Sequence, residues 1–111
     1  MLSTLLLFTT GRKSGKELVL PLIYRPAGDN SYCIIASKGG APVHPAWYLN
    51  LEAQPEVTIK VANDTLAVKG RVAEGEEREA LWQLMADYYP PYNDYQASTD
   101  RQIPVVVLES R

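Results

Sequence analysis

Alternating and continuous apolar runs predict about six short strands along this chain. Residues 57–61 and 66–69 alternate strictly between apolar and polar side chains, on either side of an Asn63-Asp64 turn. This pattern is typical of a β-hairpin with one face in water. Four longer apolar runs are also expected to be strands: residues 3–9, 18–24, 32–36 and 103–108. Pro21 places the second of these at a sheet edge or a bulge, because proline cannot donate a ladder hydrogen bond.

Two segments have helical patterns. Residues 74–88 carry one apolar stripe at helical spacing, made of Leu81, Leu84, Met85 and Tyr88. A second helix is expected at 45–53, starting at Pro45. Pro90 and Pro91 end the longer helix, and a polar, tyrosine-rich loop is expected after them.

The short turns between consecutive strands favour antiparallel pairing over a parallel βαβ sheet. The expected fold class is therefore α+β, mainly β: a small closed or partly open antiparallel barrel with flanking helices. Its 111 residues fit one domain, spanning 1–111.

Charge is distributed unevenly along the chain. The net charge is −2, but residues 1–40 carry +3 and residues 41–111 carry −5. The overall balance argues against a nucleic-acid partner. The single Cys33 excludes an intrachain disulfide and suits a reducing, cytoplasmic location, while the single His44 leaves no His/Cys cluster for a metal. No run approaches the roughly 20 apolar residues of a membrane span.

The positive charge gathers in two glycine-containing loops, residues 9–16 (Thr-Thr-Gly-Arg-Lys-Ser-Gly-Lys) and 37–42 (Ser-Lys-Gly-Gly-Ala-Pro). Glycine lets backbone N–H groups turn toward an anion, and lysine or arginine supplies the countercharge. A phosphorylated ligand at one end of the sheet is the hypothesis. An ATP-binding P-loop is excluded, because three residues rather than four separate Gly11 from Gly15 and Glu17 follows the lysine. The alternatives are an ordinary basic hairpin turn and a flexible connector.

Aromatic residues offer a further candidate surface. Trp47 follows the second loop and is expected either in the core or against a ligand, since large aromatics bury area in both settings. Tyr89, Tyr92 and Tyr95 are spaced by three and would line a pocket or pack on the barrel. Asp100 and Arg101 are expected to form a structural salt bridge. Because no nucleophile–base set is present, a cofactor would carry any reaction.

In their order and spacing, eight stretches resemble the deazaflavin-dependent nitroreductase family, within the split-barrel flavin-binding superfamily. They are residues 9–16, 21–22, 37–40, 45–51, 55–57, 77–78, 89–95 and 99–106. The resemblance implies a six-stranded antiparallel split β-barrel that binds coenzyme F-420, an 8-hydroxy-5-deazaflavin with a phosphodiester and a polyglutamate tail. It also implies an oxidoreductase that passes hydride from the reduced cofactor to a small-molecule acceptor, namely a quinone, an enone or a nitroaromatic.

The resemblance also assigns residues to roles. Arg12, Lys13 and Ser14 of the first loop, with Ser37 and Lys38 of the second, would bind the cofactor's phosphate and tail. The Gly39-Gly40 backbone and Trp47 would flank them. Tyr89, Tyr92 and Tyr95 would line the substrate side and act in catalysis.

The chain departs from the family pattern at two points. Leu18 stands where many relatives carry arginine, and the N-terminal segment is shorter than in many relatives. The first departure weakens the expected grip on a polyglutamate tail, so FMN is the competing cofactor. The second leaves closure of the site and peripheral membrane association open. The resemblance is also compatible with a homodimer, with a non-catalytic flavin or deazaflavin carrier, and with a barrel that binds only another protein.

Overall fold

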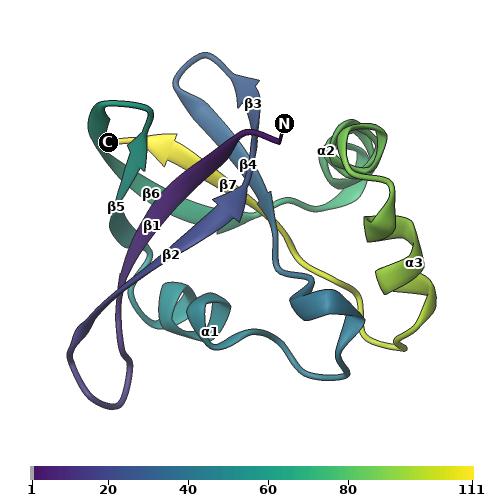
Figure 1. The fold of residues 1–111 in the computed structure, drawn as a ribbon, viewed down its shortest axis with the longest axis horizontal. Coiled ribbons are helices and arrows are strands. Elements are labelled where there is room, and N and C mark those ends of the chain that lie inside the picture. The colour runs from purple at the N-terminus through teal and green to yellow at the C-terminus, as the bar shows by residue number, and fades with distance from the viewer. Residues whose placement is uncertain (1) are drawn as a thin grey trace.

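A computed structural model describes residues 2–111, in which seven strands form one antiparallel sheet curled into an open barrel (Figure 1). The strands lie in the order β2-β1-β5-β6-β7-β4-β3 across the sheet. Their bounds are β1 Thr4–Thr10, β2 Glu17–Ile23, β3 Arg25–Gly28, β4 Ser31–Ile35, β5 Glu56–Val61, β6 Asp64–Val72 and β7 Val105–Ser110. The predicted barrel is confirmed, and Pro21 lies on the edge strand β2 as expected.

The barrel interior follows from the period-two pattern of its strands. Leu5 and Leu7 of β1 and Ile59 of β5 point inward and are at most 1% exposed. Leu7 pairs directly with Ile59, which in turn pairs with Leu66 of β6. One register therefore gathers the apolar side chains of three strands into a single core, because a shift of one residue would turn them all outward.

Strands β4 and β7 are buried on both faces. Ile34 and Val106 belong to the barrel core, whereas Cys33 and Val107 pack beneath the helices on the other side. This accounts for the continuous apolar runs at 32–36 and 103–108, because a strand covered on both faces has no polar face to alternate with.

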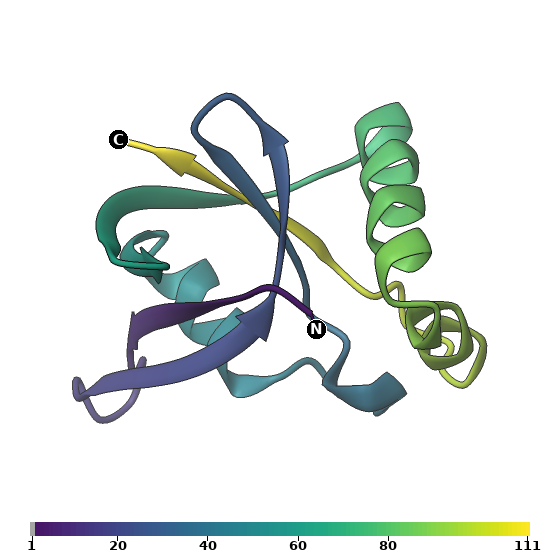
Figure 2. The ribbon, with the colours of Figure 1, turned by 45° about the horizontal axis from the view of Figure 1, so that its top comes forward.

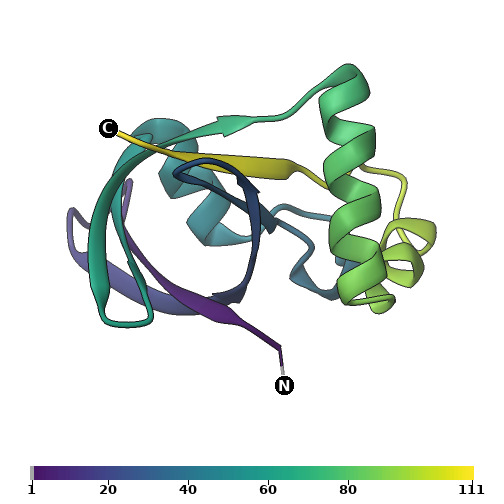
Figure 3. The ribbon, with the colours of Figure 1, turned by 90° about the horizontal axis from the view of Figure 1, so that it is seen from above.

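The helices are α1 Ala46–Ala53, α2 Gly75–Tyr88, α3 Pro91–Ala97 and a short 3₁₀ helix, η1 Lys38–Gly40. Helices α2 and α3 stand beside the barrel (Figure 2), and a view turned by a further 45° shows both outside the ring of strands (Figure 3). Met85 of α2 and Tyr92 of α3 anchor them in the second core, where both are at most 5% exposed. No helix within residues 2–111 is long and apolar enough to cross a membrane.

Two elements differ from the sequence prediction. Residues 25–28 form a seventh strand, β3, which pairs with β4 through an irregular register between Pro26 and Gly28. Residues 91–97 form helix α3 instead of the expected loop, because Pro91 occupies a first-turn position where a missing N–H costs nothing.

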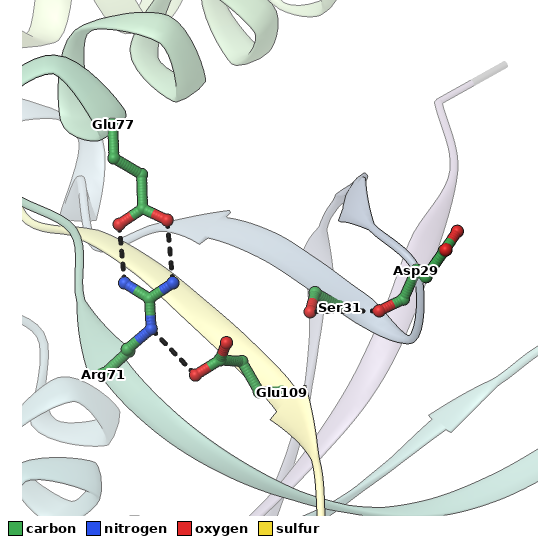
Figure 4. A network of polar contacts seen from close by, with 5 residues as sticks. All are labelled: Asp29, Ser31, Arg71, Glu77 and Glu109. Atoms are coloured by element: carbon green, nitrogen blue, oxygen red, sulfur yellow. Dashed lines mark hydrogen bonds and ion pairs between the residues drawn. The ribbon is translucent and has the colours of Figure 1, made fainter.

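On the outer surface of the sheet, one arginine joins three elements (Figure 4). Arg71 of β6 forms a bidentate pair with Glu77 of α2, at 2.6 and 2.7 Å, and donates through Nε to Glu109 of β7 at 2.8 Å. All three side chains are more than 40% exposed, so water screens these ion pairs.

Candidate functional site

A cavity of about 250 Å³ lies where β2, β4, η1 and the two outer helices meet. Its walls come from the end of β2, the end of β4, the second glycine loop and the tyrosines of the α2–α3 region: Pro21, Leu22, Ile23, Ile35, Ser37, Gly39, Tyr89, Tyr92 and Tyr95. Five of the eleven site residues expected from the sequence, Ser37, Gly39 and the three tyrosines, therefore meet in one place. The lining is mostly apolar with a few hydroxyl groups, as in most small-molecule sites.

The three tyrosines form one aromatic cluster. Their ring centroids are 5.0 Å apart for Tyr89–Tyr92, 6.2 Å for Tyr92–Tyr95 and 6.5 Å for Tyr89–Tyr95. The hydroxyl oxygens of Tyr89 and Tyr95 lie 3.4 Å apart and share a hydrogen bond. Burial raises the pKa of Tyr92, and the bond to Tyr89 raises the pKa of Tyr95. Both phenols therefore stay protonated at neutral pH and can donate a hydrogen bond.

The second glycine loop has an unusual backbone. Lys38, Gly39 and Gly40 all have positive φ, at 46°, 62° and 83°. A Cβ on Gly39 would meet nothing within 4 Å, consistent with its place on the cavity wall. A Cβ on Gly40 would collide with the Ser98 hydroxyl and the Tyr95 carbonyl. The loop is thus pressed against α3 on one side and open on the other.

Arg101 binds this loop from behind. Its guanidinium donates to the carbonyl oxygens of Ser37 at 2.7 Å, Ala41 at 2.8 Å and Ala36 at 3.3 Å. The expected salt bridge between Asp100 and Arg101 is wrong, because the arginine's donors are committed to backbone carbonyls and to His44 Nδ1. A side chain some sixty residues away in sequence therefore shapes the loop.

The first glycine loop lies elsewhere. It closes the β1–β2 hairpin with backbone bonds from Gly11 N–H to Lys16 O and from Gly15 N–H to Gly11 O, both 2.8 Å. Arg12, Lys13 and Ser14 are exposed and do not line the cavity. All three ribbon views place this turn and η1 on opposite sides of α1 (Figures 1 to 3).

Asn50 of α1 binds Arg12 of the first loop, a role that was not predicted from the sequence. Its Oδ1 accepts hydrogen bonds from the backbone N–H and the Nη1 of Arg12, each at 3.1 Å. Asn50 is only 3% exposed. The one sequence signal that could have found it is its place between Leu49 and Leu51 in an apolar helical segment, since a polar residue buried there needs a partner.

Trp47 is 8% exposed and belongs to the barrel core, where its ring meets Tyr48 edge-on. It lines neither the tyrosine cavity nor a second cavity of about 260 Å³ between α1 and β6. Lys38 and Gly40 also lie off the cavity wall, although Gly39 between them is on it. Cys33 is fully buried, and desolvation raises the pKa of its thiol to about 12, so it is not a nucleophile at neutral pH.

These features fit a flat, anionic redox cofactor. The apolar wall of Leu22, Ile23 and Ile35 and the tyrosine rings suit an aromatic ring system. Ser37 and the open face of Gly39 border the same cavity, and the exposed Lys38 lies between them in sequence, which suits a phosphate at the cavity mouth. The cavity is smaller than most ligand pockets, so a tail attached to the ring would run outside it.

Comparison with known proteins points the same way. The model of the F420H2-dependent quinone reductase family matches residues 1–110. An F420H2-dependent quinone reductase of Mycobacterium tuberculosis is 40% identical over 111 residues, covering 97% of this chain and 74% of that protein. A solved F420-H2-dependent reductase (FDR-A) is 44% identical with a TM-score of 0.87, over 96% of this chain and 94% of that one.

Two other solved structures extend the comparison. One described as a domain-swapped dimer is 44% identical, with a TM-score of 0.87 over 96% of this chain and 80% of that one. The haem storage protein HutZ of Vibrio cholerae shares the fold at 17% identity, with a TM-score of 0.76 over 98% of this chain and 82% of that one. From the family match and the close relatives, this chain belongs to the F420H2-dependent quinone reductase family, and its fold is the split barrel.

Proposed function

We propose that this protein transfers hydride from reduced coenzyme F-420 to a quinone-type acceptor in the tyrosine-lined cavity. The observation that carries the proposal is the meeting of Ser37 and Gly39 with Tyr89, Tyr92 and Tyr95 around one cavity. One wall suits the cofactor's phosphate end and the other suits an electron-poor acceptor. Enones and nitroaromatics belong to the same acceptor class, because each develops negative charge on oxygen when hydride is added.

The chain's residues would hold the cofactor at three places. The apolar wall of Leu22, Ile23 and Ile35 would bind the deazaflavin ring beside the tyrosines, and Ser37, Lys38 and the Gly39 backbone would bind the phosphate. The Gly40 N–H already donates to Ser37 O at 2.9 Å, so Gly40 would only support the turn. Arg12, Lys13 and Ser14, on the far side of α1, would reach only an extended anionic tail. For Trp47, a residue of α1, we propose that the side chain packs in the barrel core and does not touch the cofactor, as its burial favours.

When bound, the reduced cofactor supplies a hydride from carbon 5 of its ring. The tyrosine hydroxyls would donate hydrogen bonds to the charge that develops on the acceptor oxygen, where fixed donors lower a barrier most. The raised pKa values of Tyr92 and Tyr95 keep both groups protonated through neutral pH. Turnover is therefore expected to stay level through neutral pH and to fall only at alkaline pH, where Tyr92 and Tyr95 lose their protons.

The test is to follow oxidation of reduced coenzyme F-420 with menadione, cyclohexenone and a nitroaromatic. Tyr92→Phe and Tyr95→Phe should each slow turnover by up to about 10²-fold while changing cofactor affinity less than twofold, since only a donor is removed. Tyr32→Phe, on β4 and outside the cavity lining, is the matched control. Unchanged turnover in both site variants would remove the hydroxyls from the mechanism. Tight cofactor binding with no acceptor reduced would favour a carrier.

We also propose a homodimer and a cytoplasmic location. The dimer rests on the relative described as domain-swapped, and light scattering of the purified protein would decide it. The location rests on the lone buried Cys33, which suits a reducing compartment.

A further inference from the structure

Arg101 lies between α3 and β7, and all the hydrogen bonds of its side chain run to a segment far away in the chain. Nε donates to Ala41 O at 2.8 Å, Nη2 to Ser37 O at 2.7 Å, and Nη1 to Ala36 O at 3.3 Å and His44 Nδ1 at 3.0 Å. None of these partners is a carboxylate. The positive charge of Arg101 is therefore held against backbone carbonyls beneath the second glycine loop, whereas that of Arg71 is paired with two glutamates.

The loop above it is in a conformation that its own sequence does not favour. Lys38 has a φ of 46°, a left-handed value that a side chain with a Cβ rarely adopts. Such a residue persists only where its surroundings hold it, and residues of this kind gather at functional sites. Arg101 bonds the carbonyl immediately before Lys38, that of Ser37, and the carbonyl of Ala41 after Gly40. These two contacts hold both ends of the strained turn.

A second set of contacts joins the same turn to the C-terminal end of helix α3, which carries Tyr92 and Tyr95. Ser98 Oγ lies 2.8 Å from Tyr95 O and 3.3 Å from Gly40 O. The space that a Cβ on Gly40 would need is filled by Ser98 and the Tyr95 backbone. The turn is thus attached to α3 through Ser98, while Arg101 bonds the carbonyls of Ser37 and Ala41 on either side of it.

We infer that Arg101 is a positioning residue for cofactor binding: it holds residues 37–41 in their anion-binding shape before the cofactor arrives. The inference rests on the proposed function, because it gives the loop a phosphate to bind. A planar guanidinium suits this task, since its five donors point in fixed and different directions toward separate carbonyls. A lysine in its place would keep the charge but could not satisfy the same carbonyls with that geometry.

The experiment compares wild type with Arg101→Met, Arg101→Lys and the control Arg71→Met. Hydrogen exchange on the free protein measures order in residues 37–41 without any ligand. Affinity is then measured for coenzyme F-420 and for the deazaflavin riboside, which carries the ring and its ribityl chain without the phosphodiester and the tail. We expect Arg101→Met to speed exchange at 37–41 at least tenfold, to weaken coenzyme F-420 at least tenfold and to weaken the riboside less than threefold. Arg101→Lys should fall between wild type and Arg101→Met, and Arg71→Met should match wild type.

Three results would overturn the inference. The first is unaltered exchange and affinity in Arg101→Met. The second is an equal loss for both ligands together with faster exchange across the whole barrel, which describes a purely structural residue. The third, which decides the matter if Arg101→Met does not fold, is an Arg101→Lys variant identical to wild type. If the wild-type protein fails to bind coenzyme F-420, both the proposed function and the cofactor part of this inference are overturned. If the wild type binds normally and the variants behave like it, only the inference is overturned.

Discussion

The two glycine loops, residues 11–16 and 37–41, contain the same residue types but differ in how the rest of the molecule supports them. The first is an exposed hairpin turn whose shape comes from its own backbone bonds, with Asn50 holding only Arg12. The second also has its own turn bonds, from Gly40 N–H to Ser37 O and from Ala41 N–H to Lys38 O. Its three consecutive left-handed residues are in addition held from behind by Arg101 and Ser98. Only the second borders the tyrosine cavity.

The comparison shows that glycine and cation content marks a loop that could bind an anion, while the packing behind the loop makes it a site. A turn that bends freely loses entropy when a ligand orders it. A turn held in place before binding avoids that loss, which is the general advantage of preorganisation.

The largest expected effect comes from adding a methyl group to each loop. Gly40→Ala meets both a left-handed backbone and a collision with Ser98 and Tyr95, so we expect it to lower the free energy of unfolding by about 2–5 kcal/mol. Gly15→Ala meets the backbone penalty alone, because nothing lies within 4 Å of its Cβ, and should cost about 1–2 kcal/mol. Urea denaturation measures both. Equal losses would show that the second loop is no more tightly packed than the first.

The next largest effect is a difference in cofactor affinity between substitutions of Lys38 in the second loop and Lys13 in the first. Lys38→Ala should weaken coenzyme F-420 about tenfold, near 1.4 kcal/mol, since it removes a charge beside the cavity mouth. Lys13→Ala should weaken it no more than about threefold, and only for cofactor with a polyglutamate tail, because distant exposed charges are screened by salt. Titrations at low and high salt, with tailed and tail-free cofactor, test the pair. A larger loss from Lys13→Ala than from Lys38→Ala would reverse the roles of the loops.

The smallest effect concerns the exposed arginine used above as a control. Arg71→Ala breaks three hydrogen bonds to glutamates, yet all the groups are well exposed, so the loss should be only about 0–1 kcal/mol. Thermal unfolding with and without 0.5 M salt measures it. A loss above 2 kcal/mol would mean that the ion pairs joining α2 to the sheet matter more than their exposure indicates.

Much of the barrel could be predicted from the sequence because its strands follow simple periodic patterns. The β5–β6 hairpin was visible in strict alternation, and β4 and β7 in continuous apolar runs. β3 was missed because Arg25-Pro26-Ala27-Gly28 has the composition of a turn and becomes a strand only through pairing with β4. Helix α3 was missed because Pro91 was interpreted as a helix breaker, although proline is also favoured at a helix start.

The site was predictable as far as its residue types were distinctive. Glycines with a lysine and three evenly spaced tyrosines indicated two walls, and the structure places Ser37, Gly39 and the tyrosines around one cavity. Arg101 was not predictable in its actual role, because its partners are backbone carbonyls, which every residue carries. Asn50 was missed for a related reason, since its partner Arg12 is 38 residues away.

The most direct test of the central claim is a fluorescence titration of the purified protein with oxidised coenzyme F-420 and, separately, with FMN. We predict selective binding of the deazaflavin, weakened by Lys38→Ala and unaffected by Arg71→Ala. Selective binding of FMN, or binding of neither, would contradict the account, because the second glycine loop and the tyrosine cavity would then not form a deazaflavin site.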